Sequence, residues 1–409
     1  MKIGRTVSGR LTLVAAAGAL AAAAGLAGAL ATGPAASASP PATKAAAVRT
    51  PTWHMQAPPE PAGTIQQAAT AVSCSSSSAC LAIAINAYPH STDLGTFAET
   101  WNGSHWTVRS VPNGRNNAGL NGVKCRSAHW CMAVGVIKAV PPTGDYVPVA
   151  DRWNGRAWAQ VKPPVPADAT TGELAAVACT GTTACTAVGS SVKGGGAPRP
   201  LAERWNGSAW KVQPAPAPPA GGGQLAAVAC PAADACRAVG SDNKGLFSEV
   251  RNGSSWLIRP VPVPAGGSFA ELNGVSCTAA DFCEAVGSYE QGSTFLPLAE
   301  AWNGSHWHLQ APSTVSGEPS AGLNAVSCVS ATDCEAAGDA GAKEGPQEVG
   351  VLEKWNGTRW SVQEKVRPAG DLAARLNGIS CTAGPVCEAV GWHEKSIPNS
   401  DVLALRYSS

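Results

Sequence analysis

The cysteines are the residues whose type and spacing first indicate a definite chemistry. All fourteen fall into pairs separated by five residues, and no histidine recurs in step with them. The pairs are Cys74/Cys80, Cys125/Cys131, Cys179/Cys185, Cys230/Cys236, Cys277/Cys283, Cys328/Cys334 and Cys381/Cys387. An even count at one repeated spacing is typical of disulfides, whereas zinc sites favour other ligand spacings. We therefore predict seven local disulfides, with no metal and no other cofactor.

A second set of repeated side chains places an acid beside two tryptophans. The hexapeptide WNG-x-x-W, or a close variant, starts at Trp101, Trp153, Trp205, Arg251, Trp302 and Trp355. Two residues before each start stands an acid, namely Glu99, Asp151, Glu203, Glu249, Glu300 and Glu353. Catalysis needs one distinctive centre, and these six acids are alike. We interpret the tryptophans as core residues and each acid as an acceptor for an indole N–H or a partner for a nearby Lys or Arg. The alternative is a multivalent sugar-binding motif.

The Asn-Gly dipeptide of this motif indicates a tight hairpin turn. Asn-Gly is preferred in the two-residue turn whose central residues both have positive φ. With that turn, Trp101 faces Ser104 and Glu99 faces Trp106 across the hairpin, so that the two tryptophans form a diagonal pair.

These residues belong to a unit that repeats about every 51 residues along the 409-residue chain. One unit begins at Leu225 with the short strand LAAVAC, and the loop between the cysteines leads to a second strand, CRAVG. A loop of variable length precedes a third strand such as LAERW, and the fourth strand carries the second tryptophan. Glycine (45 residues) and proline (32 residues) favour turns over long helices. Seven such units predict an all-β fold, a seven-bladed β-propeller of four-stranded blades with one hairpin disulfide per blade.

The two ends of the chain indicate how such a ring closes. The last unit stops at LALRYSS, where Tyr407 stands in register with the first Trp of the motif and no fourth strand follows. A matching strand is found near the other end, in TPTWHMQAPPEPAG around Trp53. We therefore predict that the last blade is closed by the N-terminal strand, which removes an exposed sheet edge. The propeller domain is expected to span residues 51–409.

The first residues have the pattern of a secretory signal. A basic start, MKIGRTVSGR, precedes an Ala-rich apolar run and the small residues Ala36-Ser37-Ala38. We expect a signal peptide over residues 1–38 and a disordered linker over 39–50; an uncleaved membrane anchor is the alternative. The mature protein is then a secreted, extracellular monomer without a membrane span, either free or associated with the cell wall. Because 29 basic and 28 acidic residues nearly balance, the charge excludes a nucleic-acid partner.

Ligand-binding residues are expected where the units differ. In a propeller the cystine loops and Asn-Gly turns share one face and are repeated, whereas the loops between second and third strands share the other face and vary. The candidates on that variable face are Tyr88, His90, Asp145, Tyr146, Lys244, Tyr289, Glu290, Trp392, His393 and Glu394. Four residues just before first strands are expected to ring the channel mouth, namely Glu173, Gln224, Glu271 and Arg375. The alternative for each is an ordinary solvated loop residue.

The repeat resembles those of secreted bacterial β-propeller proteins, in particular the Asp-box (BNR-repeat) group related to sialidases. The WNG-x-x-W segment occupies the turn between third and fourth strands, where the Asp-box lies, and VSC-x5-C-x-A-V-G at Val275 is similar to repeats of exported actinobacterial propellers. The resemblance covers about residues 50–409. It implies an arginine triad with a Tyr/Glu pair at the channel in the sialidase-like enzymes, and no residues of this chain are assigned to that set.

The sequence favours an exported binding module for an extracellular carbohydrate or protein, and it assigns no catalytic residue. Two alternatives stay open. One is an enzyme that acts on extracellular polysaccharide, a glycosidase or a lyase, which needs an acid pair or a metal cluster at the channel mouth. The other is a passive scaffold at the cell surface.

Overall fold

The computed structural model describes residues 52–89, 94–112, 118–138, 145–219, 221–341, 347–384, 386–397 and 399–408. The predicted signal peptide, the predicted linker and His90 lie outside these residues. All the regular elements of the described part are β-strands. This part contains no helix long and apolar enough to span a membrane. The all-β prediction is confirmed.

The strands follow one another in groups of four, which we call units. Unit 1 consists of β2 (Gln66–Ser76), β3 (Ala79–Ala87), β4 (Leu94–Trp101) and β5 (Trp106–Ser110). Unit 2 consists of β6 (Ala118–Ser127), β7 (Trp130–Lys138), β8 (Tyr146–Trp153) and β9 (Trp158–Gln160). Unit 3 consists of β10 (Thr171–Gly181), β11 (Ala184–Val192), β12 (Arg199–Trp205) and β13 (Trp210–Gln213). Unit 4 consists of β14 (Gln224–Ala232), β15 (Ala235–Ser241), β16 (Leu246–Asn252) and β17 (Ser255–Pro260).

The remaining units follow the same order. Unit 5 consists of β18 (Ser268–Ala279), β19 (Phe282–Gln291), β20 (Thr294–Trp302) and β21 (Trp307–Gln310). Unit 6 consists of β22 (Ser320–Ser330), β23 (Asp333–Gly341), β24 (Val349–Trp355) and β25 (Trp360–Val366). Unit 7 consists of β26 (Ala373–Thr382), β27 (Val386–Ser396) and β28 (Asn399–Ser408), and its fourth strand is β1 (Thr52–Gln56) from the other end of the chain.

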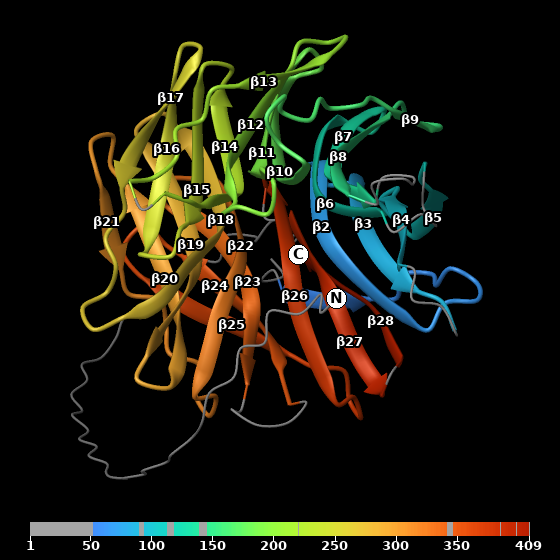
Figure 1. The fold of residues 1–409 in the computed structure, drawn as a ribbon. Coiled ribbons are helices and arrows are strands. Elements are labelled where there is room, and N and C mark those ends of the chain that lie inside the picture. Colours follow the sequence, from blue (N-terminus) through green and yellow to red (C-terminus); the bar gives the residue numbers. More distant parts are fainter. Residues whose placement is uncertain are drawn as a thin grey trace, which may run out of the picture.

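Each unit is an antiparallel meander. Units 2 to 6 are separate four-stranded sheets, whereas units 1 and 7 belong to one eight-stranded sheet because a single parallel pair, Gln66 with Ser400, joins β2 to β28. In Figure 1 the first strands lie around the middle of the molecule and the fourth strands lie at its periphery. Each first strand contacts the first strand of the next unit, and β26 contacts β2.

The predicted cystines join the first two strands of every unit. All seven pairs form disulfides, with Cα atoms 3.9–4.1 Å apart, and the described residues contain no free cysteine. The bridges are Cys74–Cys80, Cys125–Cys131, Cys179–Cys185, Cys230–Cys236, Cys277–Cys283, Cys328–Cys334 and Cys381–Cys387. The disulfide prediction is confirmed for every pair.

The cystine loops were expected on one face of the propeller, but at least half of each cystine is buried in the core. The second cysteine of each pair is buried in every unit, and these residues are Cys80, Cys131, Cys185, Cys236, Cys283, Cys334 and Cys387. The register explains the difference, because the second cysteine lies directly opposite the first tryptophan of the motif, as Cys80 does opposite Trp101 and Cys131 opposite Trp153. These seven cysteines are therefore core residues, and no ligand can reach them from the loops.

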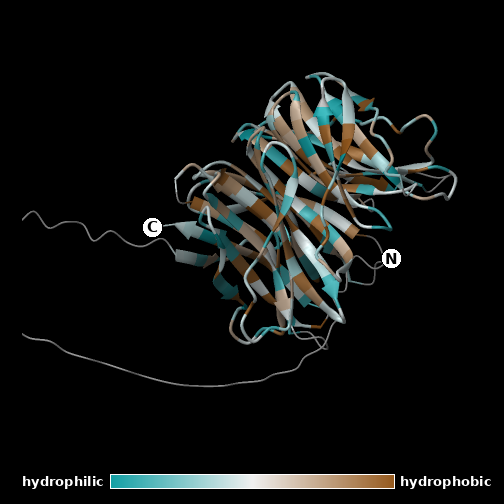
Figure 2. Cartoon of the chain, turned by 90° about the vertical axis from the view of Figure 1, so that its left-hand side faces the viewer, coloured by the Kyte–Doolittle hydropathy of each residue, from teal (hydrophilic) through white to brown (hydrophobic). Residues whose placement is uncertain are grey.

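The core lies between sheets rather than within one sheet. Met132 and Val134 of unit 2, for example, pack with Cys185 and Trp205 of unit 3. Cys283 packs in the same way with Ala227 and Val239 of unit 4. Figure 2 shows apolar residues (brown) running along the strands.

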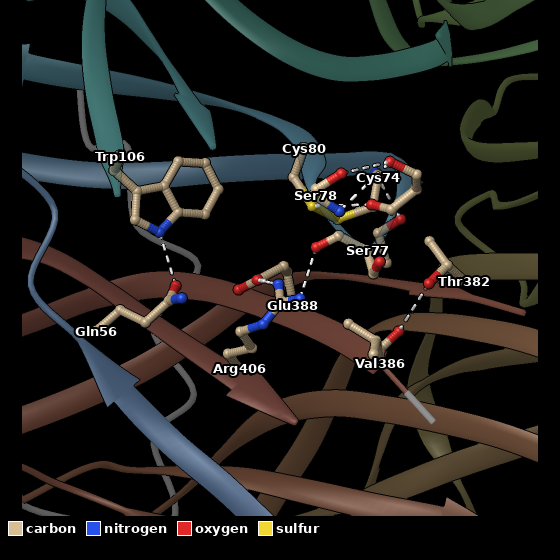
Figure 3. Close-up of polar contacts among 12 residues, drawn as sticks. Gln56, Cys74, Ser77, Ser78, Cys80, Trp106, Thr382, Val386, Glu388 and Arg406 are labelled. Atoms are coloured by element: carbon tan, nitrogen blue, oxygen red, sulfur yellow. Dashed lines mark hydrogen bonds and ion pairs between the residues drawn. A yellow bond between two sulfur atoms is a disulfide. The ribbon is translucent and has the colours of Figure 1, made fainter. Parts of the chain in front are cut away.

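The second tryptophan of a unit is held by the unit before it. Trp106 of unit 1 donates its indole N–H to Gln56 of β1, at 2.7 Å between Nε1 and Oε1 (Figure 3). The same bond joins Trp256 to Gln213, Trp360 to Gln310 and Trp53 to Gln363. Each glutamine stands three residues after the tryptophan of its own unit. Where another residue stands there, the indole N–H of Trp158 or Trp210 has no hydrogen-bond partner in the described part.

A serine before the first cysteine makes another bond between units. Its hydroxyl oxygen accepts the backbone N–H of the first cysteine in the next unit, at 2.9 Å each time. The pairs are Ser73 with Cys125, Ser276 with Cys328, Ser327 with Cys381, and Ser380 with Cys74. The last pair joins unit 7 to unit 1. The serine–cysteine bond is therefore the same between the last and the first unit as it is between consecutive units.

An arginine also joins unit 7 to unit 1, as Arg204 joins unit 3 to unit 4 and Arg237 joins unit 4 to unit 5. Arg406 on β28 binds Glu388 on β27 and donates from Nη2 to the backbone oxygen of Ser77, at 2.6 Å (Figure 3). Its guanidinium lies 5.3 Å from the ring centroid of Trp101 in unit 1. Beside it, Trp53 lies opposite Tyr407 and their ring centroids are 5.3 Å apart. The N-terminal strand therefore pairs with the last strand of the chain, with Trp53 opposite Tyr407.

The predicted turn in WNG-x-x-W is wrong. Trp101 lies directly opposite Trp106, and Glu99 lies opposite Val108. The register is therefore shifted by two residues from the one expected for a two-residue turn. The indoles form a direct cross-strand pair, with ring centroids 5.6 Å apart, instead of a diagonal one.

The side chain of the asparagine explains the difference. Gly103 has a positive φ of 97°, but Asn102 has a negative φ. The Oδ1 atom of Asn102 accepts from the backbone N–H groups of Ser104, at 2.9 Å, and His105, at 3.0 Å. An asparagine that caps its own turn in this way needs no left-handed backbone. The loop therefore holds four residues between the two tryptophans.

The repeated acids are buried, as a structural role requires. Burial raises the pKa of Glu99, Glu203, Glu249 and Glu300 to about 8, and the pKa of Asp151 and Glu353 to about 7. Neither carboxyl oxygen of Glu203, Glu249 or Glu300 has a hydrogen-bond partner in the described part of the chain. The expectation of an indole or basic partner is wrong for these three. Each is held as a neutral acid at pH values below its raised pKa.

We expect the protein to lose stability as the pH rises from about 4.5 to about 8. A buried acid keeps its proton in the folded protein at pH values where the unfolded chain has released it. The stabilisation is complete below the ordinary pKa of 4.5 and is lost as the pH rises through the folded pKa of about 8. Urea denaturation at about pH 5 and about pH 8 measures the loss. Glu203→Gln reduces the difference, whereas Glu364→Gln, at an exposed site, is the matched control; equal pH dependence in both variants would contradict the expectation.

Deleting β1, residues 52–56, is expected to lower the melting temperature and to promote association. The deletion leaves β28 as an open sheet edge, which templates pairing with other chains. It also removes the partners of Trp106 and Gln363. Thermal unfolding and light scattering check this against His54→Ala, a control at an exposed side chain of the same strand. A deletion variant that behaves like the control would show that β1 does not contribute to stability.

Candidate functional site

A cavity of about 1250 Å³ lies where the first strands of all seven units meet. The shape of these strands explains its lining. In every first strand a bulge follows a buried leucine, or Ala69 in unit 1, and interrupts the pairing with the second strand. A bulge turns the side chains around it. Residues on both sides of the leucine therefore face the cavity.

The lining residues form three rings. The mouth ring stands just before the leucine and consists of Ala68, Glu173, Gln224, Glu271, Gly322 and Arg375. The amide ring stands just after it and consists of Thr70, Asn121, Ala175, Ala226, Asn273, Asn324 and Asn377. The apolar ring stands two residues further along and consists of Val72, Val123, Val177, Val228, Val275, Val326 and Ile379. The mouth ring is the most varied of the three.

The amide ring holds the units together. Asn121 donates from Nδ2 to the backbone oxygen of Leu174 at 3.0 Å, and Asn377 donates to that of Ala69 at 2.9 Å. Asn273 and Asn324 make the same bond to the following unit. Sequence reasoning missed these residues, although the recurring Leu-Asn-Gly/Ala was a visible signal. Because their N–H groups are bound within the protein, the amide ring has fewer donors left for a ligand.

Four acids and one base line the cavity, namely Glu173, Glu271, Asp339, Glu394 and Arg375. Arg375 places Nε 3.0 Å from Oδ1 of Asp339, and both side chains are largely buried. Asn324 donates to the same carboxylate oxygen at 2.8 Å. Since the single guanidinium balances Asp339, the three glutamates give the cavity lining a net negative charge.

Acids are also crowded behind this pair. Burial raises the pKa of Glu348, and the charge of Asp339 adds to the rise. Arg375 opposes the rise, whereas Glu394 adds to it. Three acids, Asp339, Glu348 and Glu394, therefore interact in this part of the protein with one base, Arg375.

One buried acceptor at the cavity lacks a donor. Gln67 on β2 lines the cavity and is only 2% exposed, and its Oε1 has no hydrogen-bond partner in the described part. Its backbone is satisfied, because Gln67 N–H donates to Ser400 Oγ at 3.3 Å and Ser400 Oγ donates to Gln67 O at 3.2 Å. A buried carbonyl oxygen without a donor costs about 1–3 kcal/mol. Because this oxygen has almost no exposed surface, a ligand N–H or O–H supplies the missing donor once the side chain turns toward the cavity.

Two aromatic residues stand at the mouth. Phe269 is 78% exposed, and among the described residues it is the one non-glycine residue with positive φ, at 46°. The pairing of β18 with β19 shifts between Ser268 and Glu271, which leaves Phe269 outside the ladder. Trp392 on β27 lies opposite Arg375 and also lines the cavity. An exposed aromatic in a costly backbone conformation is typical of a ligand site. Sequence reasoning missed Phe269, since nothing in its local pattern marks a left-handed backbone.

The predicted site residues divide between the cavity and its surroundings. Those that line the cavity are Trp392, Glu394, Glu173, Gln224, Glu271 and Arg375. Those of the described part that do not line it are Tyr88, Asp145, Tyr146, Lys244, Tyr289, Glu290 and His393. Their role in ligand binding stays a prediction. The cysteines do not line the cavity either, in keeping with a purely structural role.

Three of the residues outside the cavity have local roles. The Nδ1 atom of His393 lies 2.5 Å from Oδ2 of Asp371. Lys244 is exposed in a turn where its N–H donates to Asp242 at 2.7 Å. Tyr289 packs against the core between units 4 and 5. Among the described residues, no group of three or more His, Cys, Asp or Glu side chains is placed to hold a metal ion.

Comparison with known proteins identifies the fold. No protein-family pattern and no curated protein sequence matches the chain. Among solved structures, YCF48 bound to D1 peptide is similar, with a TM-score of 0.53 and 14% identity over 87% of this chain and 95% of that chain. The extracellular domain of the hybrid two-component system BT4673 from B. thetaiotaomicron is similar, with a TM-score of 0.52 and 10% identity over 88% of this chain and 40% of that chain. Ulvan lyase, a polysaccharide lyase, is similar, with a TM-score of 0.50 and 8% identity over 84% of this chain and 94% of that chain. These neighbours are β-propeller proteins, and the likeness shows that this chain has the same type of fold.

Arg375→Ala is expected to destabilise the protein by about 3 kcal/mol, because it leaves the buried carboxylate of Asp339 without its cation. Replacing both partners, Arg375→Leu with Asp339→Leu, is expected to restore much of that loss, since no buried charge then remains. Urea denaturation of the three proteins measures both effects. A double variant less stable than the single one would show that the pair itself, rather than the uncompensated charge, determines the stability.

Proposed function

We infer that the chain is an exported, monomeric, seven-bladed β-propeller that binds an extracellular carbohydrate or protein at the mouth of its central cavity. The observation that carries this proposal is the difference between the two ends of the first strands. The hairpin end repeats one disulfide and one turn. The mouth end brings together side chains that differ from unit to unit, including Glu173, Gln224, Arg375 and Trp392. A single ligand needs such a distinctive set of polar and aromatic groups.

Several contacts support seven blades closed by β1. The serine–cysteine bond, the glutamine–tryptophan bond and the amide-ring bond each occur between units 7 and 1 as they do between consecutive units. Seven disulfides and the leader-like N-terminal sequence support export, because disulfides persist in oxidising surroundings. The Asn-capped turn between third and fourth strands supports a relationship to the Asp-box group, in which this turn carries the motif.

Trp392→Ala is expected to weaken ligand binding by about tenfold or more and to leave the melting temperature within a few degrees. Binding of the purified protein to an array of immobilised oligosaccharides and to a phage-displayed heptapeptide library measures the effect. Trp130→Ala, the same truncation at the hairpin end, is the matched control. Equal loss in the two variants would place the ligand elsewhere on the protein.

The array also separates binding from catalysis. Release of shortened oligosaccharides from immobilised polysaccharide would overturn the binding proposal in favour of an extracellular polysaccharide-acting enzyme. Failure of every probe to bind would overturn it in favour of a passive scaffold.

A further inference from the structure

We propose that the ligand of the central cavity is a peptide segment that inserts lysine or arginine side chains, an inference that rests on the proposed binding function and names its ligand class. Four features of the cavity mouth carry it: its charge, its excess of acceptors, its aromatic side chains and its apolar floor.

The charge at the cavity is local. The whole chain carries almost equal numbers of basic and acidic residues, yet the cavity lining holds four acids and Arg375 alone among the bases. Arg375 is already paired with Asp339 at 3.0 Å. A concave surface lined by one sign of charge concentrates field lines and attracts the opposite charge. The ligand is therefore a cation.

The hydrogen-bonding groups point to a cation that donates. Carboxylates only accept hydrogen bonds, and the buried Oε1 of Gln67 also requires a donor. One N–H of each asparagine in the amide ring is bound to a backbone oxygen of the neighbouring unit. Ammonium and guanidinium groups carry several N–H donors and no acceptor. They match this surplus of acceptors, whereas a sugar hydroxyl brings acceptors of its own.

The apolar parts of the cavity favour an amino-acid side chain over an amino sugar. Beyond the amide ring lie six valines and Ile379, and Phe269 and Trp392 flank the mouth. A lysine or arginine that enters from the mouth lays its apolar stem against Phe269 and Trp392 and its charged head against the acids and the amide ring, before the valines. Their heads also bind over aromatic faces. An amino sugar would instead bury hydroxyl groups against the valines, where they find no partner.

Titration calorimetry with blocked tetrapeptides at low salt tests the proposal. Acetylated and amidated tetralysine and tetra-arginine are expected to bind, with affinity that falls as salt rises, because exposed charges are screened. Tetraglutamine is the uncharged control, and deacetylated chitotetraose is the amino-sugar probe. Glu173→Gln with Glu394→Gln is expected to weaken tetralysine binding by about tenfold, an amount typical of removing two charges from a charge-complementary site.

The matched control carries the same two charge losses away from the cavity. Asp281→Asn with Glu364→Gln changes exposed residues of the hairpin end and of an outer strand, and tetralysine binding should be unchanged. Equal binding of tetraglutamine, binding of chitotetraose in place of the peptides, or equal loss in the control variant would each overturn the proposal. If Trp392→Ala abolishes binding of an uncharged ligand while the glutamate variant does not, the binding function stands and only the cationic peptide is excluded.

Discussion

No sheet of this molecule can cover both of its own faces, and the rest of the structure depends on that constraint. Seven hydrophobic clusters of the described part each join two units: Ala69 and Phe97 of unit 1, for example, pack with Val390 and Val402 of unit 7. A unit alone would expose apolar surface on both sides, so its stability comes from the neighbours. Disulfides join only strands within a unit. The cohesion between units is therefore non-covalent, apart from the chain that links them.

Close approach of the first strands determines what remains in the middle. A Cβ at Gly122 would lie 2.9 Å from Cα of Ala176 in the next unit, closer than real side chains allow, so the bulge positions stay small. Seven strands that approach so closely still leave a space between them, and the bulges direct three rings of side chains into it. The asparagines of the amide ring serve the contacts between units. The mouth ring makes no bond that repeats from unit to unit, although Arg375 binds Asp339 of unit 6, and its residues therefore differ between units.

Sequence patterns predicted the parts that depend on short spacing and repetition. The C-x5-C pairs, the burial of the motif tryptophans and the pairing of β1 with β28 follow from local strand geometry and from the missing strand after Tyr407. The turn register was wrong because an asparagine side chain can replace a left-handed backbone, and the sequence Asn-Gly is the same in both turns. The donor-free oxygen of Gln67 and the exposed ring of Phe269 depend on packing across units, which no single repeat encodes.

Six units carry a buried acid at a position where burial favours an apolar side chain. An unpaired carboxyl between sheets is less favourable than an apolar side chain, and in unit 7 the same position is Leu405, which is 3% exposed. The geometry therefore does not require an acid there. Unit 7 is also the unit whose fourth strand, β1, comes from the other end of the chain. In units 1 to 6 the four strands are consecutive in the chain, so they remain close together even when one position is unfavourable. In unit 7 the outer strand is held by pairing, by packing and by the side-chain hydrogen bonds of Trp53 and Gln56, and an apolar residue opposite Met55 adds to the packing. Leu405 therefore replaces the acid in the one unit whose fourth strand is not joined to the other three by a short stretch of chain.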